Sequence, residues 1–357
     1  MRVCILGSGL SSLTLAKSLV NQKINVDILY TKKTYPVNKT RTIGISKSNI
    51  EFFNEKIINI EKIIHKLKKI EIYSDNLEKQ KLIGFGNNSD HLFSIVQNHK
   101  LQGILEKNLF SNKYFRKINY KNKINYSKDY DLVFNTDFNH SITKKYFNKK
   151  IEKKYKSVAY TTIIKHEKIS NKVAVQIFTK NGPLAFLPIS EYETSVVYSI
   201  NNYLKSELEI NNLIYNYNPK YNLKKINKIY SFELQGLSLR SYFHKNILAF
   251  GDLLHRIHPL AGQGFNMTIR DIKILNYIIQ KKIDLGLPLD STLNNEFENN
   301  QKHKNYIFCS GIDIIHEFFN LERKTENNFL SKSIRYFNKN PSINKIFTKI
   351  ADKGLLF

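Results

Sequence analysis

Residues 251–266 read GDLLHRIHPLAGQGFN, a stretch with three glycines, one proline and no lysine in a chain that is otherwise rich in lysine and asparagine. The apolar residues 247–250 before it are typical of a buried strand. After Gly264, apolar side chains recur at helical spacing, so a helix is predicted to begin near Asn266. Those side chains are Ile269, Ile272, Leu275 and Ile279. The pattern therefore predicts a strand, a glycine-rich loop and a helix whose N-terminus faces that loop.

This predicted loop is suited to an anionic ligand. Free backbone N–H groups and the positive end of the helix dipole meet at a helix N-terminus. Gly262 and Gly264 let a ligand approach the backbone closely, and Asp252 can accept hydrogen bonds from a polyol. The alternative is a capped helix after a turn, with His255 and His258 as loop residues. Two histidines three residues apart could also indicate a metal site. The acidic and thiol partners of the usual metal-binding patterns are missing nearby, so no metal is expected.

The N-terminal residues predict a second glycine turn between a strand and a helix. Apolar residues 3–6 precede GSGLSS at residues 7–12, a helical pattern follows, and residues 26–29 form another apolar run. This βαβ arrangement is typical of dinucleotide-binding folds, in which glycines let the chain approach a pyrophosphate. Ser12 stands where a third glycine is usual, and Tyr30 stands where an acidic residue would accept ribose hydroxyls. The alternative is a tight turn without a ligand.

Length and composition exclude several classes of protein. The chain has 357 residues, 41% of them hydrophobic, which is enough for about two domains with a buried core. Cys4 and Cys309 lie too far apart in the sequence to indicate a disulfide framework or a zinc site. The sequence has no uncharged apolar run of about 18 residues, so neither a membrane span nor secretion is expected. A cytoplasmic protein is therefore expected.

The chain is strongly basic, with 56 basic against 30 acidic residues and a formal net charge of +26. The excess is scattered lysine rather than basic residues interleaved with aromatic ones, so nucleic acid is not an expected partner. The accompanying abundance of asparagine and isoleucine indicates a base-composition bias behind much of the charge. Weak attraction to acidic lipid at a membrane surface is expected instead, and the basic amphipathic segment 343–357 favours it.

The pattern GDxxHxxxPxxGQGxNxxxxD resembles the second flavin motif of class A flavoprotein monooxygenases, the para-hydroxybenzoate hydroxylase superfamily. It is filled by Gly251, Asp252, His255, Pro259, Gly262, Gln263, Gly264, Asn266 and Asp271. Within that superfamily, NGPLAFLPI at residues 181–189 and RTIGIS at residues 41–46 resemble the ubiquinone-biosynthesis hydroxylases. The order of these elements is similar to that family across nearly the whole chain.

The resemblance implies a site for FAD. It would place Gly7, Gly9 and Ser12 at the pyrophosphate, Arg41 at the phosphates or ribityl chain, and the loop 262–264 at the N1 and C2=O edge of the ring. The full set of implied cofactor-binding residues is Gly7, Gly9, Ser12, Tyr30, Arg41, Gln97, Asp137, Gly251, Asp252, Pro259, Gly262, Gln263, Gly264 and Asn266. No catalytic residue is identified, although His255 and His258 are the nearest titratable side chains.

Three positions depart from the family pattern. The family's middle signature, an Asp-Gly pair after an apolar strand, is here Asp137 followed by Phe138. A phenyl ring at that position would narrow the access of flavin and nicotinamide. Ser12 and Tyr30 are the other two departures. Together they leave open a protein that has drifted from the family or that binds flavin weakly.

The implied fold is α/β and has three parts. Residues 1–60, 96–145 and 235–290 would form a discontinuous, Rossmann-like FAD-binding domain of the glutathione-reductase type. Residues 61–95 and 146–234 would form an inserted mixed or antiparallel β-sheet domain that covers the substrate. Residues 291–357 would form a C-terminal helical region.

The implied activity is hydroxylation of the aromatic ring of a polyprenylated phenol, a ubiquinone precursor. In that family NAD(P)H reduces FAD, dioxygen forms a flavin hydroperoxide, and its distal oxygen is transferred to the ring. The expected location is peripheral, at the inner face of a membrane, with a quinone-synthesis complex as a partner. Two alternatives stay open: a non-catalytic or weakly flavinylated assembly partner of such a complex, and an FAD-dependent reductase of isoprenoid double bonds.

Overall fold

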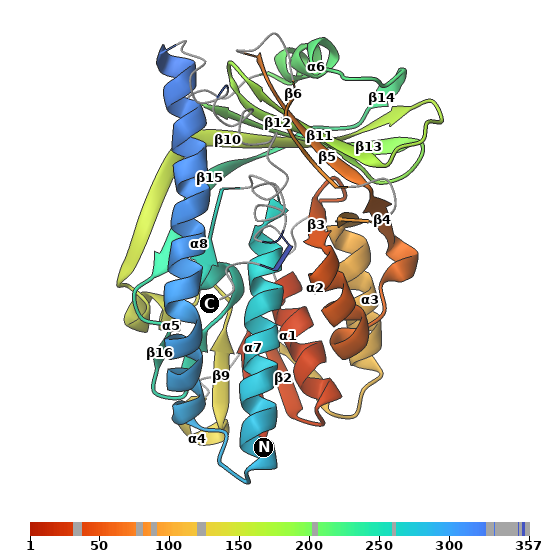
Figure 1. Cartoon of the computed structure of the whole chain (residues 1–357). Helices are drawn as coiled ribbons and strands as arrows, with labels where there is room; N and C mark the ends of the chain where they lie inside the picture. The colour runs from red at the N-terminus through yellow and green to blue at the C-terminus, as the bar shows by residue number, and fades with distance from the viewer. Residues whose placement is uncertain are drawn as a thin grey trace.

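The computed structural model describes residues 1–30, 38–75, 81–86, 91–119, 126–201, 206–258, 262–325, 332, 349 and 352–353. Two large sheets dominate it (Figure 1). One belongs to an α/β unit that contains the N-terminus, and the other lies over the end of that unit. The predicted fold class, α/β with a second large sheet and a C-terminal helix, is confirmed.

The sheet of the α/β unit has six strands in the order β16-β17-β9-β1-β2-β8. Their bounds are β1 (Arg2–Leu6), β2 (Asn25–Tyr30), β8 (Phe115–Asn119), β9 (Leu132–Asn135), β16 (Phe243–His244) and β17 (Ile247–Ala249). All neighbours are parallel except β16 and β17. Helices cover a parallel sheet on both faces, which is why β1 and β17 are continuous apolar runs without alternation. Both strands are where the sequence predicts them.

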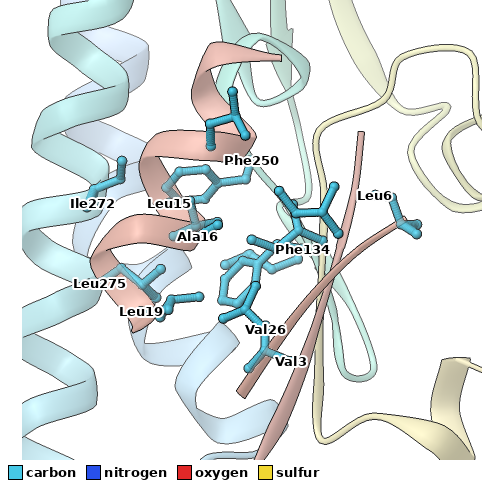
Figure 2. Packing of buried hydrophobic residues seen from close by; sticks show 14 of the residues in the cluster. Val3, Leu6, Leu15, Ala16, Leu19, Val26, Phe134, Phe250, Ile272 and Leu275 are labelled. Atoms are coloured by element: carbon cyan, nitrogen blue, oxygen red, sulfur yellow. The ribbon is translucent and has the colours of Figure 1, made fainter. Parts of the chain in front are cut away.

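Helices α1 (Leu10–Asn21) and α7 (Gly264–Asp284) pack in succession against this sheet. Figure 2 shows Leu15, Ala16 and Leu19 of α1 between the strands and the α7 side chains Ile272 and Leu275. All of these side chains are at most 2% exposed, so the two helices that follow the glycine turns are anchored in one core. The other helices of this unit are α2 (Lys47–Phe52), α3 (Asn98–Phe110), α4 (Tyr126–Asp129) and α5 (Ser141–Tyr146), with the short turns η1 (Phe53–Ile57), η2 (Glu61–Ile63) and η4 (Gly251–Leu253).

The second large sheet has nine strands, in the order β18-β15-β10-β13-β12-β11-β5-β6, with β14 paired to β10. Their bounds are β5 (Lys69–Ser74), β6 (Lys81–Phe85), β10 (Lys150–His166), β11 (Val173–Thr179), β12 (Gly182–Pro188), β13 (Glu193–Asn201), β14 (Leu223–Ile226), β15 (Tyr230–Leu239) and β18 (His255–Arg256). A separate small sheet joins β3 (Thr42–Ser46), β7 (Phe93–Gln97) and β4 (Ile64–Leu67). The domain limits drawn from the sequence stay a prediction.

The alternating pattern of β12 shows how the nine-stranded sheet is used. Leu184 and Phe186 are fully buried and share a cluster with Ile210 and Ile214 of α6 (Glu207–Asn216), which covers that face. The residues between them point to the opposite face and line a cavity. The sheet therefore presents one face to a helix and the other to the cavity described below.

Helix α8 (Ser291–Thr325) runs along the molecule from the α/β unit to the nine-stranded sheet (Figure 1). At its start Phe297 packs against Phe250, and near its end Phe319 stacks on Phe178 of β11 with ring centroids 3.5 Å apart. The helix thus fixes the two sheets relative to one another. Within the described ranges, no helix is both long enough and apolar enough to cross a membrane.

Candidate functional site

A cavity of about 1260 Å³ lies between the α/β unit and one face of the nine-stranded sheet. Its wall combines turn residues such as Gly9 and Gly264 with sheet residues such as Val175 and Leu187. Ligand pockets in proteins usually measure about 300–1,000 Å³. This cavity therefore has room for a large cofactor together with a substrate.

The N-terminal glycine turn exposes its backbone to this cavity. Gly7 has a φ of +109°, and a Cβ there would lie 2.5 Å from the Thr136 hydroxyl oxygen, so only glycine fits. A Cβ at Gly9 would meet no atom within 4 Å. Helix α1 begins at Leu10, directly behind these glycines. The turn thus offers open backbone and a positive helix end to an anion, as predicted for a pyrophosphate.

Ser12 takes the place of the third glycine and has a structural task. It is fully buried, and its Oγ lies 2.7 Å from Oγ1 of Thr136. Because Thr136 Oγ1 donates its own proton to the carbonyl oxygen of Leu6, the hydroxyl of Ser12 is the donor to Thr136. A hydrogen bond therefore ties α1 to the end of β9, where a glycine would provide close packing alone.

Tyr30 ends β2 at the cavity wall, and a carboxylate is nearby after all. The ring of Tyr30 lies 5.0 Å from Lys117 Nζ, and Lys117 lies 3.1 Å from Oε1 of Glu106 on α3. Glu106 and Lys117 also line the cavity. The sequence reasoning missed Glu106 because it belongs to a helix far along the chain and no local motif marks it.

Arg41 and Thr42 reach the cavity from the start of β3. Gln97 pairs with Thr42 in the β3–β7 ladder and is the last residue of β7. Among the residues that the structure describes, the wall includes Asn98 and His99 but not Gln97. The polar groups at this part of the wall thus come from the start of α3, and a contact of Gln97 with the ribityl chain stays a prediction.

Asp137 and Phe138 follow β9 and line the cavity. Asp137 closes a tight turn, since its Oδ1 accepts a hydrogen bond of 2.9 Å from the Asn139 backbone. Two cations lie near the ring of Phe138, with Lys150 Nζ at 4.9 Å and the Arg256 guanidinium at 5.1 Å from its centroid. Cation–π contacts of this kind fix the ring in place. The bulk that replaces glycine is thus anchored at the wall.

Gly251 and Asp252 follow β17 and have different tasks. Gly251 has a φ of +65°, and a Cβ there would lie 2.7 Å from Cβ of Ser11, so its glycine lets the chain pass close to α1. Gly251 is buried behind the wall, whereas Asp252 is exposed to the cavity. Across the described ranges, the structure gives the Asp252 carboxylate no hydrogen bond or ion pair to another side chain. It is therefore available to a ligand with hydroxyl groups.

The loop before α7 is the second open glycine turn. Gly262 has a φ of +62°, and a Cβ there would lie 3.6 Å from the Gly44 nitrogen. A Cβ at Gly264 would meet no atom within 4 Å, and Gly264 is the first residue of α7. Gln263 is 3% exposed, and its Oε1 accepts a hydrogen bond of 3.3 Å from Arg270. Pro259 lies outside the described residues.

Asn266 lies behind the wall and joins the loop to β3. Its Nδ2 donates to the carbonyl oxygens of Gly44, at 2.9 Å, and Gly262, at 3.2 Å. Its Oδ1 accepts hydrogen bonds from the Ser46 backbone at 2.9 Å and from Asn49 Nδ2 at 2.8 Å. Asn266 is fully buried, so it supports the site from behind and does not line the cavity.

The two histidines of the motif are held by buried partners. His255 Nε2 lies 2.6 Å from Oδ2 of Asp271, and both side chains are at most 2% exposed. His258 is 1% exposed and packs against Tyr155 and His316, with ring centroids 5.0 and 4.3 Å away. These contacts agree with the reading of both histidines as residues that hold the loop. In the part of the chain that the structure describes, no group of three or more metal-ligating side chains is found.

No family model matches the chain. It is 22% identical to the mitochondrial ubiquinone biosynthesis monooxygenase COQ6 of Dictyostelium discoideum, in an alignment that covers 94% of this chain and 86% of that protein. Among solved structures, it is similar to p-nitrophenol 4-monooxygenase PnpA of Pseudomonas putida, with a TM-score of 0.79, 11% identity and coverage of 99% and 98%. It is also similar to HpxO of Klebsiella pneumoniae complexed with FAD and uric acid, with a TM-score of 0.74, 11% identity and coverage of 99% and 97%.

These similarities test the family resemblance that the sequence motifs indicate. The chain has the fold seen in FAD-dependent monooxygenases and is similar along nearly its whole length to a ubiquinone biosynthesis monooxygenase, which confirms the resemblance to the ubiquinone-biosynthesis hydroxylases.

Proposed function

We propose that this chain is an FAD-dependent monooxygenase that hydroxylates the aromatic ring of a polyprenylated phenol in ubiquinone biosynthesis, with NAD(P)H as the reductant. One observation supports this most directly. Two glycine turns, at Gly9 and Gly264, each expose the backbone at a helix start to the same cavity. FAD has a charged pyrophosphate, and its reduced ring carries a second negative charge. Each of the two glycine turns, with the helix N-terminus behind it, can hold one of these charged groups.

The residues at the wall fit FAD. Gly7 and Gly9 would hold its pyrophosphate at the start of α1, and Glu106 would accept hydrogen bonds from its ribose. Asp252 would bind a hydroxyl of the ribityl chain. FAD supplies the activation of dioxygen after it has been reduced. The protein contributes the 21-residue helix α7, whose N-terminal N–H groups stabilise negative charge on the ring at Gly264.

Four strands of the nine-stranded sheet give the cavity an uncharged stretch of wall, which suits an aromatic ring with a hydrocarbon tail. The lining residues of β5, β11, β12 and β13 carry no charge: Ile70, Ile72, Ala174, Val175, Gln176, Pro183, Ala185, Leu187, Val197 and Ser199. Burying a carboxylate against such a surface would cost several kcal/mol, roughly, unless a cation paired with it. This part of the wall therefore favours an uncharged portion of the substrate, whereas β15 and β18 contribute the charged wall residues Glu233 and Arg256.

Phe138 favours the second candidate, a weakly flavinylated assembly partner of a quinone-synthesis complex. Its ring lies at the cavity wall within 5.1 Å of Lys150 Nζ and of the Arg256 guanidinium, at the position where the family has a glycine. Absorption spectroscopy separates the two candidates. We expect the purified protein to carry FAD or to take it up. No flavin absorbance after incubation with excess FAD would exclude the enzyme and leave the assembly partner.

The substrate is tested in cells. A strain that lacks the protein should accumulate an under-hydroxylated prenylphenol and make less ubiquinone. Normal ubiquinone without such an intermediate would exclude this substrate while leaving FAD binding intact.

We also propose that the protein works at a membrane surface, where a prenylated substrate dissolves. Support comes from the net charge of +26 and from exposed apolar side chains along α8: Ile307, Ile314, Ile315, Phe318 and Leu321. Binding to lipid vesicles should rise with the fraction of acidic lipid and fall with salt, since salt screens charges at a surface. Vesicle binding that depends on neither variable would contradict the electrostatic part of this proposal.

A further inference from the structure

Asp352, near the C-terminal end of the chain, lines the same cavity as the two glycine turns. Its main-chain carbonyl oxygen accepts hydrogen bonds from Ser46 Oγ at 2.8 Å, from Ser48 Oγ at 3.0 Å and from Arg270 Nη2 at 3.3 Å. Its Oδ1 accepts a further hydrogen bond of 2.9 Å from the Ser48 backbone N–H. One residue therefore receives four hydrogen bonds at the cavity wall.

The donors come from two sides of the site. Ser46 ends β3 and Ser48 lies in α2, whereas Arg270 lies in α7. Asn266 already joins β3 to α7 directly, through its bonds to Gly44 and to the Ser46 backbone. Asp352 makes a second connection between β3 and α7, because its carbonyl oxygen accepts hydrogen bonds from Ser46 Oγ on β3 and from Arg270 on α7.

Arg270 explains why this second connection matters for the glycine loop. Burial lowers the pKa of Arg270 to about 10, while the negative charges of Asp352 and Asp271 act to raise it. A buried guanidinium must be hydrogen-bonded, because an unpaired buried charge is costly. Two of its acceptors are the carbonyl oxygen of Asp352 and Oε1 of Gln263, each at 3.3 Å. Through Arg270, Asp352 is thus connected to the loop between Gly262 and Gly264.

We propose that Asp352 is a positioning residue of the flavin site, which fastens β3 and α2 to α7 and so fixes the loop 262–264 that faces the ring of FAD. This role rests on the proposed function, since it assumes that FAD occupies the cavity. Asp352 acts through Ser46, Ser48 and Arg270 and is not a catalytic residue.

Two shortened chains test this role. A chain that ends at Lys349 lacks Asp352, and a matched chain that ends at Lys353 keeps it. We expect the first to bind FAD about tenfold more weakly than the full chain, a loss of about 1.4 kcal/mol, and the second to bind like the full chain. We also expect the absorption bands of bound flavin to shift only in the first chain, because they report the surroundings of the ring.

A double-mutant cycle identifies the partners of Asp352. In the full chain, Ser46→Ala combined with Ser48→Ala should weaken FAD binding about as much as loss of Asp352 does. The same two substitutions in the chain that ends at Lys349 should add little, because residues that share one interaction are not additive. Additive losses would mean that the serines act on FAD independently, and would overturn the role of Asp352.

Side-chain variants keep the proposal testable if the shortened chain does not fold. Asp352→Asn keeps an oxygen that can accept from the Ser48 backbone and should preserve FAD affinity, whereas Asp352→Leu removes it and should weaken binding two- to threefold, about 0.5 kcal/mol. Equal FAD binding by every variant and by both shortened chains would overturn the role of Asp352 alone. Failure of the full chain to take up FAD would overturn the proposed function with it.

Discussion

Asn266 Nδ2 donates a hydrogen bond of 2.9 Å to the carbonyl oxygen of Gly44, which joins the start of α7 to the strand opposite it. Asn266 belongs to a sequence motif that indicates a cofactor site, yet each hydrogen bond that the structure gives its side chain joins it to another protein group. It joins residues 41–46 to residues 262–266, which belong to two of the three segments that carry the family resemblance. A sequence motif can therefore include residues that support a candidate site from behind as well as residues that line it.

Asn266→Ala should destabilise the protein, and it should also loosen the loop 262–264. The substitution leaves the Ser46 backbone N–H and the Asn49 amide without their buried acceptor. Each unsatisfied buried donor costs about 1–3 kcal/mol, so we expect the free energy of unfolding to fall by about 2–6 kcal/mol. Denaturant unfolding measures it. The control is Asn108→Ala on the exposed face of α3, which should change stability by less than about 0.5 kcal/mol.

Asp252→Ala should weaken FAD binding without lowering stability. Asp252 is exposed to the cavity and holds no other described element in place. A charge-assisted hydrogen bond to a ribityl hydroxyl is worth about 1.5–3 kcal/mol, so affinity should fall by about ten- to a hundredfold. Fluorescence titration with FAD gives the affinity. The exposed Asp284 at the end of α7 provides the control variant, Asp284→Ala, and unchanged affinity in Asp252→Ala would remove Asp252 from the site.

The motif-bearing parts of the site could be predicted because their signals are local. An apolar run, a glycine and a helical period within about 20 residues identify a βα turn, and the structure has both turns at Gly9 and Gly264. The boundary between β7 and α3 is harder to predict, since Gln97 is the last strand residue and the wall begins with Asn98. A shift of one residue at a strand end reverses the direction of a side chain.

The residues that could not be predicted are those joined across long sequence distances. Glu106 meets Lys117 beside Tyr30, and Asp352 meets Ser46, only because the tertiary fold brings them together. Neither acidic residue belongs to a motif, and a single sequence contains no signal for such pairs. The departure at Tyr30 is thus accompanied by a carboxylate from α3, which is missing from the end of the strand itself.

Asp27 should control the acid stability of the α/β sheet. It is 2% exposed and accepts hydrogen bonds from Arg116 at 2.8 and 2.9 Å, from Arg2 at 2.9 Å and from Tyr130 at 3.0 Å. Burial acts to raise the pKa of Asp27, but the hydrogen bonds from Arg116, Tyr130 and Arg2 together hold it below its ordinary value. A carboxyl whose pKa is lowered by folding stabilises the protein above its unfolded pKa, about 3.9, and loses that contribution as the pH falls through its folded pKa.

Asp27→Asn should therefore lower the free energy of unfolding at pH 7 by about 1–3 kcal/mol, because the hydrogen bonds to a charged acceptor are lost. The difference from the unmodified protein should shrink below a pH of about 4. Urea unfolding at a series of pH values measures both effects. Asp129→Asn, at an exposed position near Tyr130, should leave the pH profile unchanged. A constant difference at all pH values would mean that packing, rather than charge, is what Asp27 provides.

Tyr30→Glu should tighten FAD binding if ribose hydroxyls lie at the end of β2. A carboxylate accepts two hydrogen bonds where a phenol makes one, which is worth on the order of 1 kcal/mol. Lys117, whose Nζ lies 5.0 Å from the Tyr30 ring, would offset repulsion between the new carboxylate and Glu106.

Glu106→Gln should have the opposite effect and weaken binding by about 1 kcal/mol, because it removes the carboxylate that is already present. Combining the two substitutions should then restore the affinity, and Tyr215→Glu, on a side chain 56% exposed, serves as the control. Weaker FAD binding by Tyr30→Glu, measured by fluorescence titration, would mean that the tyrosine ring packs against adenosine instead.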